Sequence, residues 1–446
     1  MAKLGDTCKR CKKEPTTIES RKDEFCSNCF IRFIRGKQRK QMQDEKFKVK
    51  FSNNIKRPKI LFDMQNDHQS YVLLDILISM LEEQLTQGPK ALRGFDLIIS
   101  IINDTYHIIN INKIIEFYTL SKIERLGIQF KNIDCEDYIK NNKFQHLKLD
   151  LPNFQTFIIS DNNENLNSNS NIKSYQNLLD QISDNSTKED LINIIHDDII
   201  LQTAKDFNCT ILIKPDSMTQ IAINILSDTI RGRGSEIPLK TQDIIINNTN
   251  NSNNNFEIIH PLRDILNSEI KIYSNIRLLN NLSPILNEIN LSSDKSNRNK
   301  SVGEMVSEYF KSLEIEYPET VSTVVKIGAK LSNFSSNNEN EYCEICKVSI
   351  YHDPKQWLEQ ITVPGCVKPQ SEEEFSNLKR YLDSINDDDH DHDEKIVDLS
   401  SQPQVKLCYG CMVTLGVSNV TDFDWPKRPT KEEILSEYIL DDQEDD

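Results

Sequence analysis

Eight cysteines fall into four C-x-x-C pairs, and their chemistry is the clearest in the sequence. Two intervening residues let both thiolates of a pair bind one ion from a tight turn. Two such turns complete a tetrahedral sulfur shell, which suits structural zinc. Because four cysteines leave no open coordination position, the pattern predicts structural rather than catalytic metal.

The two sets of pairs differ in spacing. The first has 14 residues between its pairs, enough for a small hairpin, and comprises Cys8, Cys11, Cys26 and Cys29. The second has 61 residues between its pairs and comprises Cys343, Cys346, Cys408 and Cys411. We interpret each set as one zinc site. The alternatives are unmetallated buried thiols for the first set and, for the second, Cys366 as a substitute ligand or an independent redox pair. We expect the isolated Cys135 and Cys209 to be core residues.

Positive charge is concentrated near the first cysteine set. Residues 1–60 hold 18 Lys and Arg against 7 Asp and Glu, whereas the whole chain has a formal net charge of −16. A basic segment on an acidic chain indicates contact with a polyanion. Phe30, Phe33 and Ile34 lie between cations, which favours an amphipathic helix whose other face neutralises phosphates. A solvated helix face is the alternative. The candidate cations are Lys9, Arg10, Lys12, Lys13, Arg32, Arg35, Lys37, Arg39 and Lys40.

Strand and helix patterns alternate after this segment. We expect strands at residues 59–62, 95–102, 128–133 and 209–213, and helices at 72–81, 111–126, 187–207, 217–230 and 302–331. This alternation predicts an α/β core with a parallel sheet and crossover helices. Asn-rich tracts at 162–171, 247–255 and 335–340 interrupt the pattern, and we expect disordered insertions there.

A nucleotide-binding α/β protein would place its phosphate loop directly after the first strand. The loop here has no glycine and contains two aspartates, which oppose phosphate through side-chain bulk and repulsion. We therefore predict a degenerate nucleotide loop and expect no ATP on this chain. It comprises Asp63, Met64, Gln65, Asn66, Asp67, His68, Gln69 and Ser70.

Another basic motif follows the helix predicted at 217–230. Arg231 and Arg233 alternate with Gly232 and Gly234, so the backbone there can approach a phosphate or a partner. The alternative is that Gly232 ends the helix and both arginines are solvated.

Four regions are expected from these patterns. They are a basic four-cysteine zinc module at 1–50, an α/β core at 55–331, a second four-cysteine zinc module at 341–420 and an acidic tail at 430–446. The acidic run at 387–393 is read as solvated, with loose cation binding as the alternative. No apolar run reaches membrane-span length and the first residues lack an apolar signal core, so we expect a cytoplasmic protein with reduced thiols.

The chain contains, in order, the segments CKRCKKEPTTIESRKDEFCSNCFIRFIRGKQRK, CTILIKPDSMTQIAINILSDTIRGRGSEIPL, IIHPLRDILNSEIKIY and CYGCMVTLG. In these segments it resembles the cytoplasmic tRNA 2-thiolation protein 2 family. The resemblance implies an adenine-nucleotide α-hydrolase-like core of the ATP pyrophosphatase type. Active members of that fold carry S-G-G-x-x-S after the first strand, where this chain has DMQNDHQS.

The resemblance also implies a role and partners. The chain would act beside a homologous catalytic subunit as a non-catalytic, tRNA-binding member of a heterodimer. Together they would thiolate the wobble uridine of the tRNAs for Lys, Glu and Gln, with sulfur from a thiocarboxylated ubiquitin-related modifier. Two alternatives stay open: an independent ATP-dependent enzyme, and a zinc-organised scaffold that contacts no RNA.

Overall fold

The structure is a computed structural model. It describes residues 7–52, 56–103, 109–150, 155–158, 174–246, 256–283, 286, 299–331, 341–351, 353–354, 356–357, 371, 375–377, 379–380, 404–418 and 420–427. The chain divides into two compact units, the first of residues 1–142 and 172–335 and the second of 143–171 and 336–446. This division differs from the expected boundaries, which placed 143–171 in the core. The Asn-rich tracts, the acidic run, Cys366 and the tail lie outside the described residues.

The first unit contains the N-terminal cysteines and the α/β core. Its strands are β1 (Ile18–Ser20), β2 (Asp23–Phe25), β3 (Lys59–Asp63), β4 (Asp96–Asn103), β5 (Ile128–Asp134), β8 (Ile211–Ile213), β9 (Ile244–Ile246) and β10 (Phe256–Ile259). Its helices are α1 (Ser27–Gln41), η1 (Glu45–Phe47), α2 (His68–Leu85), α3 (Ile111–Tyr118), α4 (Leu120–Leu126), α5 (Cys135–Asn141), α6 (Tyr175–Asp180), α7 (Asn185–Asp206), α8 (Met218–Ile230), η2 (Gly234–Glu236), α9 (Ile237–Thr241), α10 (Asn267–Ile276), η3 (Leu279–Asn281), α11 (Val302–Glu316) and α12 (Pro318–Gly328).

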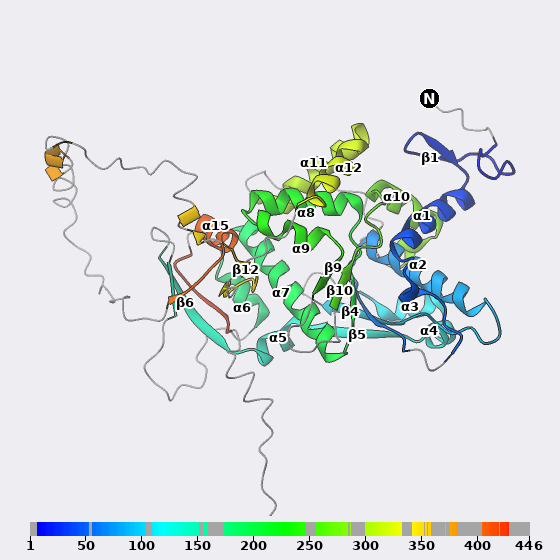
Figure 1. Ribbon diagram of the computed structural model, residues 1–446, viewed down its shortest axis with the longest axis horizontal. Coiled ribbons are helices and arrows are strands. Elements are labelled where there is room, and N and C mark those ends of the chain that lie inside the picture. Colours follow the sequence, from blue (N-terminus) through cyan, green and yellow to red (C-terminus); the bar gives the residue numbers. More distant parts are fainter. Residues whose placement is uncertain are drawn as a thin grey trace, which may run out of the picture. The chain divides into compact units, whose positions relative to one another are not determined.

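A six-stranded sheet forms the centre of this unit (Figure 1). Its order is β5-β4-β3-β8-β10-β9, with the first five strands parallel and β9 antiparallel to β10. The expected parallel-sheet α/β core is therefore confirmed. The chain order reverses between β3 and β8, so their carboxyl ends border a topological switch point, the usual ligand position in such sheets.

Helices cover both faces of the sheet at β3, which explains why β3 and the neighbouring β8 are apolar at their buried positions. Ile60 and Phe62 of β3 share a buried cluster with residues of α2, α3, α4 and α10. Leu61, between them, packs with residues of α7 in another cluster. A third cluster joins α8 to α11 and α12.

Local signals explain where several helices begin and end. The Ser217 hydroxyl accepts a hydrogen bond from the Gln220 backbone N–H (3.1 Å) and so caps the N-terminus of α8. The helix expected at 111–126 is instead two helices, because Thr119 has a φ of 67°. The helix expected at 302–331 is likewise two, and Pro318 opens the second at its first position.

The second unit contains a four-stranded antiparallel sheet that the sequence patterns did not predict. Its order is β13-β7-β6-β14, comprising β13 (Gln404–Val405), β7 (Gln155–Ile158), β6 (Phe144–Asp150) and β14 (Asp422–Pro426). The same unit contains β11 (Glu341–Tyr342), β12 (Ser349–Ile350) and α15 (Tyr409–Val417). Within the described ranges, no helix combines the length and apolar character that a membrane span requires.

Candidate metal centres and nucleic-acid interface

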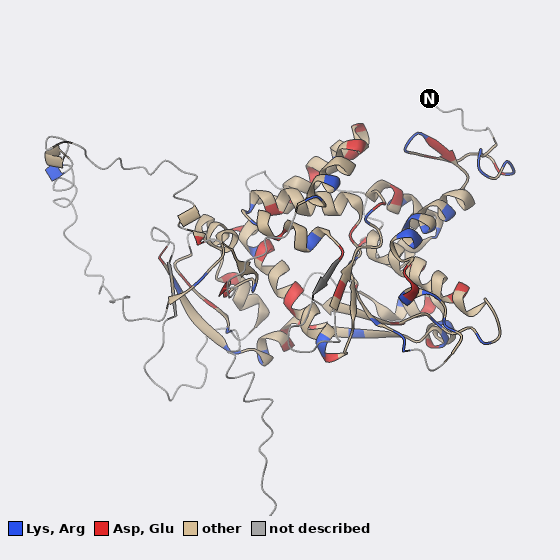
Figure 2. Cartoon of the chain, in the orientation of Figure 1, with Lys and Arg blue, Asp and Glu red and all other residues tan. Residues whose placement is uncertain are grey.

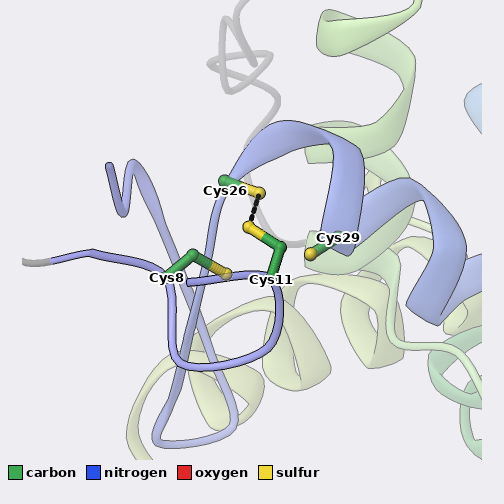
Figure 3. A group of neighbouring side chains, drawn as sticks. All are labelled: Cys8, Cys11, Cys26 and Cys29. Atoms are coloured by element: carbon green, nitrogen blue, oxygen red, sulfur yellow. Dashed lines mark hydrogen bonds between the residues drawn. The ribbon is translucent and has the colours of Figure 1, made fainter. Parts of the chain in front are cut away.

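The first four cysteines converge at the start of α1 (Figure 3). Cys8 and Cys11 lie in a turn closed by a hydrogen bond from the Lys12 N–H to the Cys8 carbonyl (2.7 Å). Cys26 is the N-cap of α1 and Cys29 lies in its first turn. All four Sγ atoms lie within 4.8 Å of one another, and those of Cys11 and Cys26 are 3.7 Å apart. A tetrahedral ion with bonds of about 2.3 Å needs sulfur atoms about 3.8 Å apart, so the site fits one such ion.

The second cysteine set has the same local arrangement despite its longer spacing. Cys343 and Cys346 lie in a turn between β11 and β12, while Cys408 is the N-cap of α15 and Cys411 follows in its first turn. Their Sγ atoms also lie within 4.8 Å of one another. In both sets the turn ends at a lysine with positive φ, Lys12 or Lys347. Each four-cysteine group can therefore hold a metal ion.

The electrostatics of the thiols favour a bound cation. Backbone N–H groups of Cys11 and Cys26 lower the pKa of Cys8 to about 6. Burial raises the pKa values of Cys26 and Cys29, because it removes water that would stabilise their thiolates, and the neighbouring Cys8 adds to the shift of Cys29. A divalent cation would remove this penalty and allow all four sulfurs to ionise.

A set of cations remains exposed around the first four-cysteine group. Figure 2 shows Lys and Arg along α1 and in the loop that precedes β1. Arg10 lies over the rings of Phe25 and Phe33, and Arg39 pairs with Glu83 at the surface. We call the following exposed residues the basic face: Lys9, Arg10, Lys12, Lys13, Arg32, Arg39 and Lys40.

Arg35 and Lys37 do not belong to the basic face, which corrects the expectation that they present charge to RNA. Arg35 donates to the hydroxyls of Tyr273 (3.1 Å) and Ser79 (2.9 Å). Lys37 donates to the Glu269 carboxylate (3.2 Å). Both side chains are turned toward the core because their partners are fixed on α2 and α10, which α1 packs against.

The Arg-Gly motif after α8 confirms one part of its alternative interpretation, the helix-ending Gly232, but not the solvated arginines. Gly232 has a φ of 75° and follows the helix, as a C′ glycine does. Arg233, however, is 1% exposed and is held by Asp190 (2.6 Å) and Glu236 (2.9 Å). Arg231 is buried against Glu189 (2.5 Å). Because carboxylates already occupy the guanidinium groups, neither arginine presents a free cation to RNA in this structure.

The loop after β3 fills its own anion position. The Asp67 carboxylate caps α2 by accepting a hydrogen bond from the Ser70 backbone N–H (2.8 Å). The Ser70 hydroxyl in turn accepts from the Gln65 N–H (3.0 Å). These are backbone donors that a phosphate loop would direct at its ligand. Side-chain oxygens of the chain itself have taken that place.

A cavity of about 720 Å³ lies beside this loop, at the switch point. Three of its cations are paired with carboxylates: Lys214 with Asp197 (2.6 Å), Lys240 with Glu236 (3.1 Å), and Lys300 with Glu308 (2.8 Å). A triphosphate would have to displace these carboxylates. The Asp63, Asp67 and Asp216 carboxylates in the same lining would also repel a triphosphate.

Burial and mutual repulsion perturb the acidic side of the cavity. Burial raises the pKa values of Asp67 and Asp216, and the neighbouring Asp63 carboxylate adds to both shifts. The His196 Nε2 atom lies 3.0 Å from Asp63. Burial lowers the pKa of His196, but the attraction of Asp63 outweighs it and the pKa of His196 is raised overall. The cavity therefore favours protons and cations over anions.

Comparison with known proteins identifies the relatives of the chain. The family model described as "Cytoplasmic tRNA 2-thiolation protein 2" matches residues 301–413. Relatives of that name include one from Debaryomyces hansenii, 35% identical over 98% of this chain and 96% of its own length. Another relative of that name, from Scheffersomyces stipitis, is 34% identical over 100% of this chain and 98% of its own length. The chain belongs to the cytoplasmic tRNA 2-thiolation protein 2 family.

The family resemblance and the expected cytoplasmic localisation agree with these names. A more distant relative of the same name, from Saccharomyces cerevisiae, is 29% identical over 95% of the chain and 94% of its own. Among solved structures, a U34-tRNA thiolase from Methanococcus maripaludis, described with its [4Fe-4S] cluster, is 16% identical with a TM-score of 0.47. The structural match covers 82% of this chain and 100% of the thiolase chain.

Some features of this family member escaped the sequence patterns. Asp75 forms an ion pair with Arg35, and Glu269 forms one with Lys37. In the sequence these two carboxylates look like ordinary surface residues of helices. His196 lies 133 residues from its partner Asp63, so no local motif joins them. The basic residues could be identified from charge alone; their division into exposed and buried groups required the fold.

Proposed function

We propose that this chain is a non-catalytic subunit of a tRNA 2-thiolation complex that binds tRNA through the basic face. The names of its relatives support tRNA 2-thiolation as the process. The loop after β3 supports the non-catalytic role. There the Asp67 carboxylate accepts the Ser70 N–H at the start of α2, where an active loop would bind a phosphate. A homologous catalytic subunit would supply ATP-dependent activation of the wobble uridine.

The substrates follow from the same proposal. The tRNAs would be those for Lys, Glu and Gln, and the sulfur would come from a thiocarboxylated ubiquitin-related modifier. The two four-cysteine groups would each hold structural zinc, and metal analysis of the purified chain would identify the element. The exposed cations beside the first group would neutralise tRNA phosphates.

An electrophoretic mobility shift with tRNA at stated salt tests the RNA contact. The variant Arg32→Glu/Arg39→Glu/Lys40→Glu reverses three charges of the basic face. Its matched control, Lys205→Glu/Lys326→Glu/Lys330→Glu, changes the net charge equally at exposed positions on or next to α7 and α12. We expect the first variant alone to lose at least about tenfold in affinity. Equal binding by both variants and the unchanged protein would favour the scaffold without RNA contact.

Calorimetric titration with ATP and magnesium tests the non-catalytic role. We expect no saturable binding to the isolated chain and no pyrophosphate release. Saturable binding that disappears in the cavity variant Lys214→Ala would instead favour an independent ATP-dependent enzyme.

A further inference from the structure

The N-terminal four-cysteine module, which we define as residues 7–41, contacts the core through a strained turn. Arg21 and Lys22 connect β1 to β2 with φ values of 50° and 71°. Two-residue turns of this kind normally take Asn-Gly, because other side chains resist the left-handed conformation. Backbone strain of this type persists only where surrounding contacts hold the residues in place.

The turn directs Arg21 onto a buried carboxylate of α10. Glu269 is 1% exposed and lies 2.9 Å from the Arg21 Nε atom. It also accepts hydrogen bonds from the Ser20 hydroxyl (2.9 Å) and from Lys37 (3.2 Å). Hairpin and helix of the module therefore meet at one side chain of the core. The remaining bond of Glu269, from the Leu266 N–H (2.9 Å), fixes it at the start of α10.

A second buried carboxylate supports the same interface. Asp75 of α2 is fully buried and accepts hydrogen bonds from Tyr273 of α10 (2.8 Å) and from Arg277, the C-cap of α10 (3.0 Å). Arg35 of the module reaches Asp75 at 3.6 Å. By contrast, Lys22 pairs with Glu319 at the surface, where both side chains are largely exposed and the pair contributes little.

We propose that Glu269 is a positioning residue that holds the four-cysteine module in one orientation on the core. The proposal rests on the proposed function: the basic face then presents tRNA at a fixed angle to the rest of the complex. Because the Glu269 carboxylate is buried and Lys37 is largely covered, removing the Glu269 charge leaves Arg21 and Lys37 without their counter-ion and releases the module. The metal ligands and the cations of the basic face are untouched by this change.

Hydrogen exchange on the full-length chain tests the anchor directly. In Glu269→Gln we expect exchange protection of the β1–β2 hairpin and the first half of α1 to fall about tenfold, with metal content unchanged. The matched control Glu319→Gln removes the exposed contact and should leave protection unchanged. Protection in Glu269→Gln equal to that in the control would overturn the proposal.

Two further variants guard against simple misfolding. Arg21→Gln alters only the module side of the contact and should produce the same loss of hairpin protection. In a double-mutant cycle, Lys37→Gln should add little to Glu269→Gln if the two residues act as a pair. Fully additive effects would show that Glu269 does not hold Lys37, which would also overturn the anchor.

Thiolation in cells separates positioning from RNA affinity. At equal protein abundance, Glu269→Gln should lower wobble-uridine 2-thiolation about tenfold while changing tRNA affinity only about twofold, because the basic face is intact. Unchanged thiolation in a variant whose module is released would refute the positioning role. If charge reversal of the basic face leaves tRNA binding intact, the proposed RNA contact fails, whereas the exchange experiment still decides the anchor.

Discussion

The Arg233 guanidinium forms ion pairs with buried carboxylates inside the protein. Its guanidinium meets Asp190 through Nε (3.0 Å) and Nη2 (2.6 Å) and meets Glu236 through Nη1. Removing one member of a buried ion pair leaves the others unpaired in a poorly solvated site. A residue that looks like an RNA contact in the sequence is therefore expected to act on stability.

Arg233→Ala should lower the free energy of unfolding by about 3–5 kcal/mol. Urea denaturation would measure the change, and tRNA affinity of the folded variant should match that of the unchanged protein. Arg39→Ala, which removes an exposed cation, should do the reverse: a small effect on unfolding and weaker tRNA binding. A tRNA-specific defect in Arg233→Ala would contradict the buried role.

The His196–Asp63 pair makes a pH-dependent contribution to stability. Since the pKa of His196 is raised in the folded chain, folding is favoured by its protonated form. The contribution is fully present below the unfolded pKa of about 6.5 and is lost as pH rises through the folded value. Unfolding of the unchanged protein and His196→Gln, measured from pH 6 to 9, should show a stability gap that narrows with rising pH. A stability difference that widens with rising pH would mean that folding lowers the pKa of His196 instead of raising it.

At the level of elements, each four-cysteine group combines a turn with the first turn of a helix. Cys26 and Cys408 are the N-caps of α1 and α15, and the Cys408 sulfur accepts a hydrogen bond from the Cys411 backbone N–H (3.4 Å). A helix N-terminus favours a thiolate, and one C-x-x-C pair of each set lies at such a position. The distance in sequence between the pairs is then free to vary.

Cys26→Ser should leave the first group with three sulfur ligands and release its metal. We expect metal content to fall from two ions per chain to about one, with the β1–β2 hairpin losing its exchange protection. Cys209→Ser, a change at a buried cysteine outside both groups, is the control and should retain both ions. Unchanged stoichiometry in Cys26→Ser would show that the ligand assignment is wrong.

For the whole molecule, the uneven charge distribution predicts how salt affects RNA binding. The basic face lies on a chain whose formal net charge is −16. The basic face therefore attracts tRNA only at short range, while the chain as a whole repels tRNA at longer range. The logarithm of tRNA affinity should fall linearly with the logarithm of salt concentration. Arg32→Glu/Arg39→Glu/Lys40→Glu should flatten that slope by about three, one for each lost phosphate contact. An unchanged slope would place the RNA elsewhere.

The sequence by itself determined the features that depend on local pattern. Apolar runs at 59–62 and 209–213 predicted β3 and β8, because a strand buried on both faces must be apolar throughout. The C-x-x-C spacing predicted the cysteine groups, since two intervening residues already limit how the thiolates can point. The missing glycines predicted a degenerate nucleotide loop, which stays a prediction; in the structure Asp67 accepts the Ser70 N–H there.

Only the tertiary structure decided which basic side chains face solvent and which of them form ion pairs with buried carboxylates. Arg35 and Arg39 lie one helical turn apart with the same charge, yet one reaches Asp75 and the other the surface. Their difference depends on α2 and α10 packing beside α1, which no local pattern encodes. Nor did the sequence reveal that β6 and β7 join β13 and β14, because antiparallel pairing across more than 200 residues is set by long-range register.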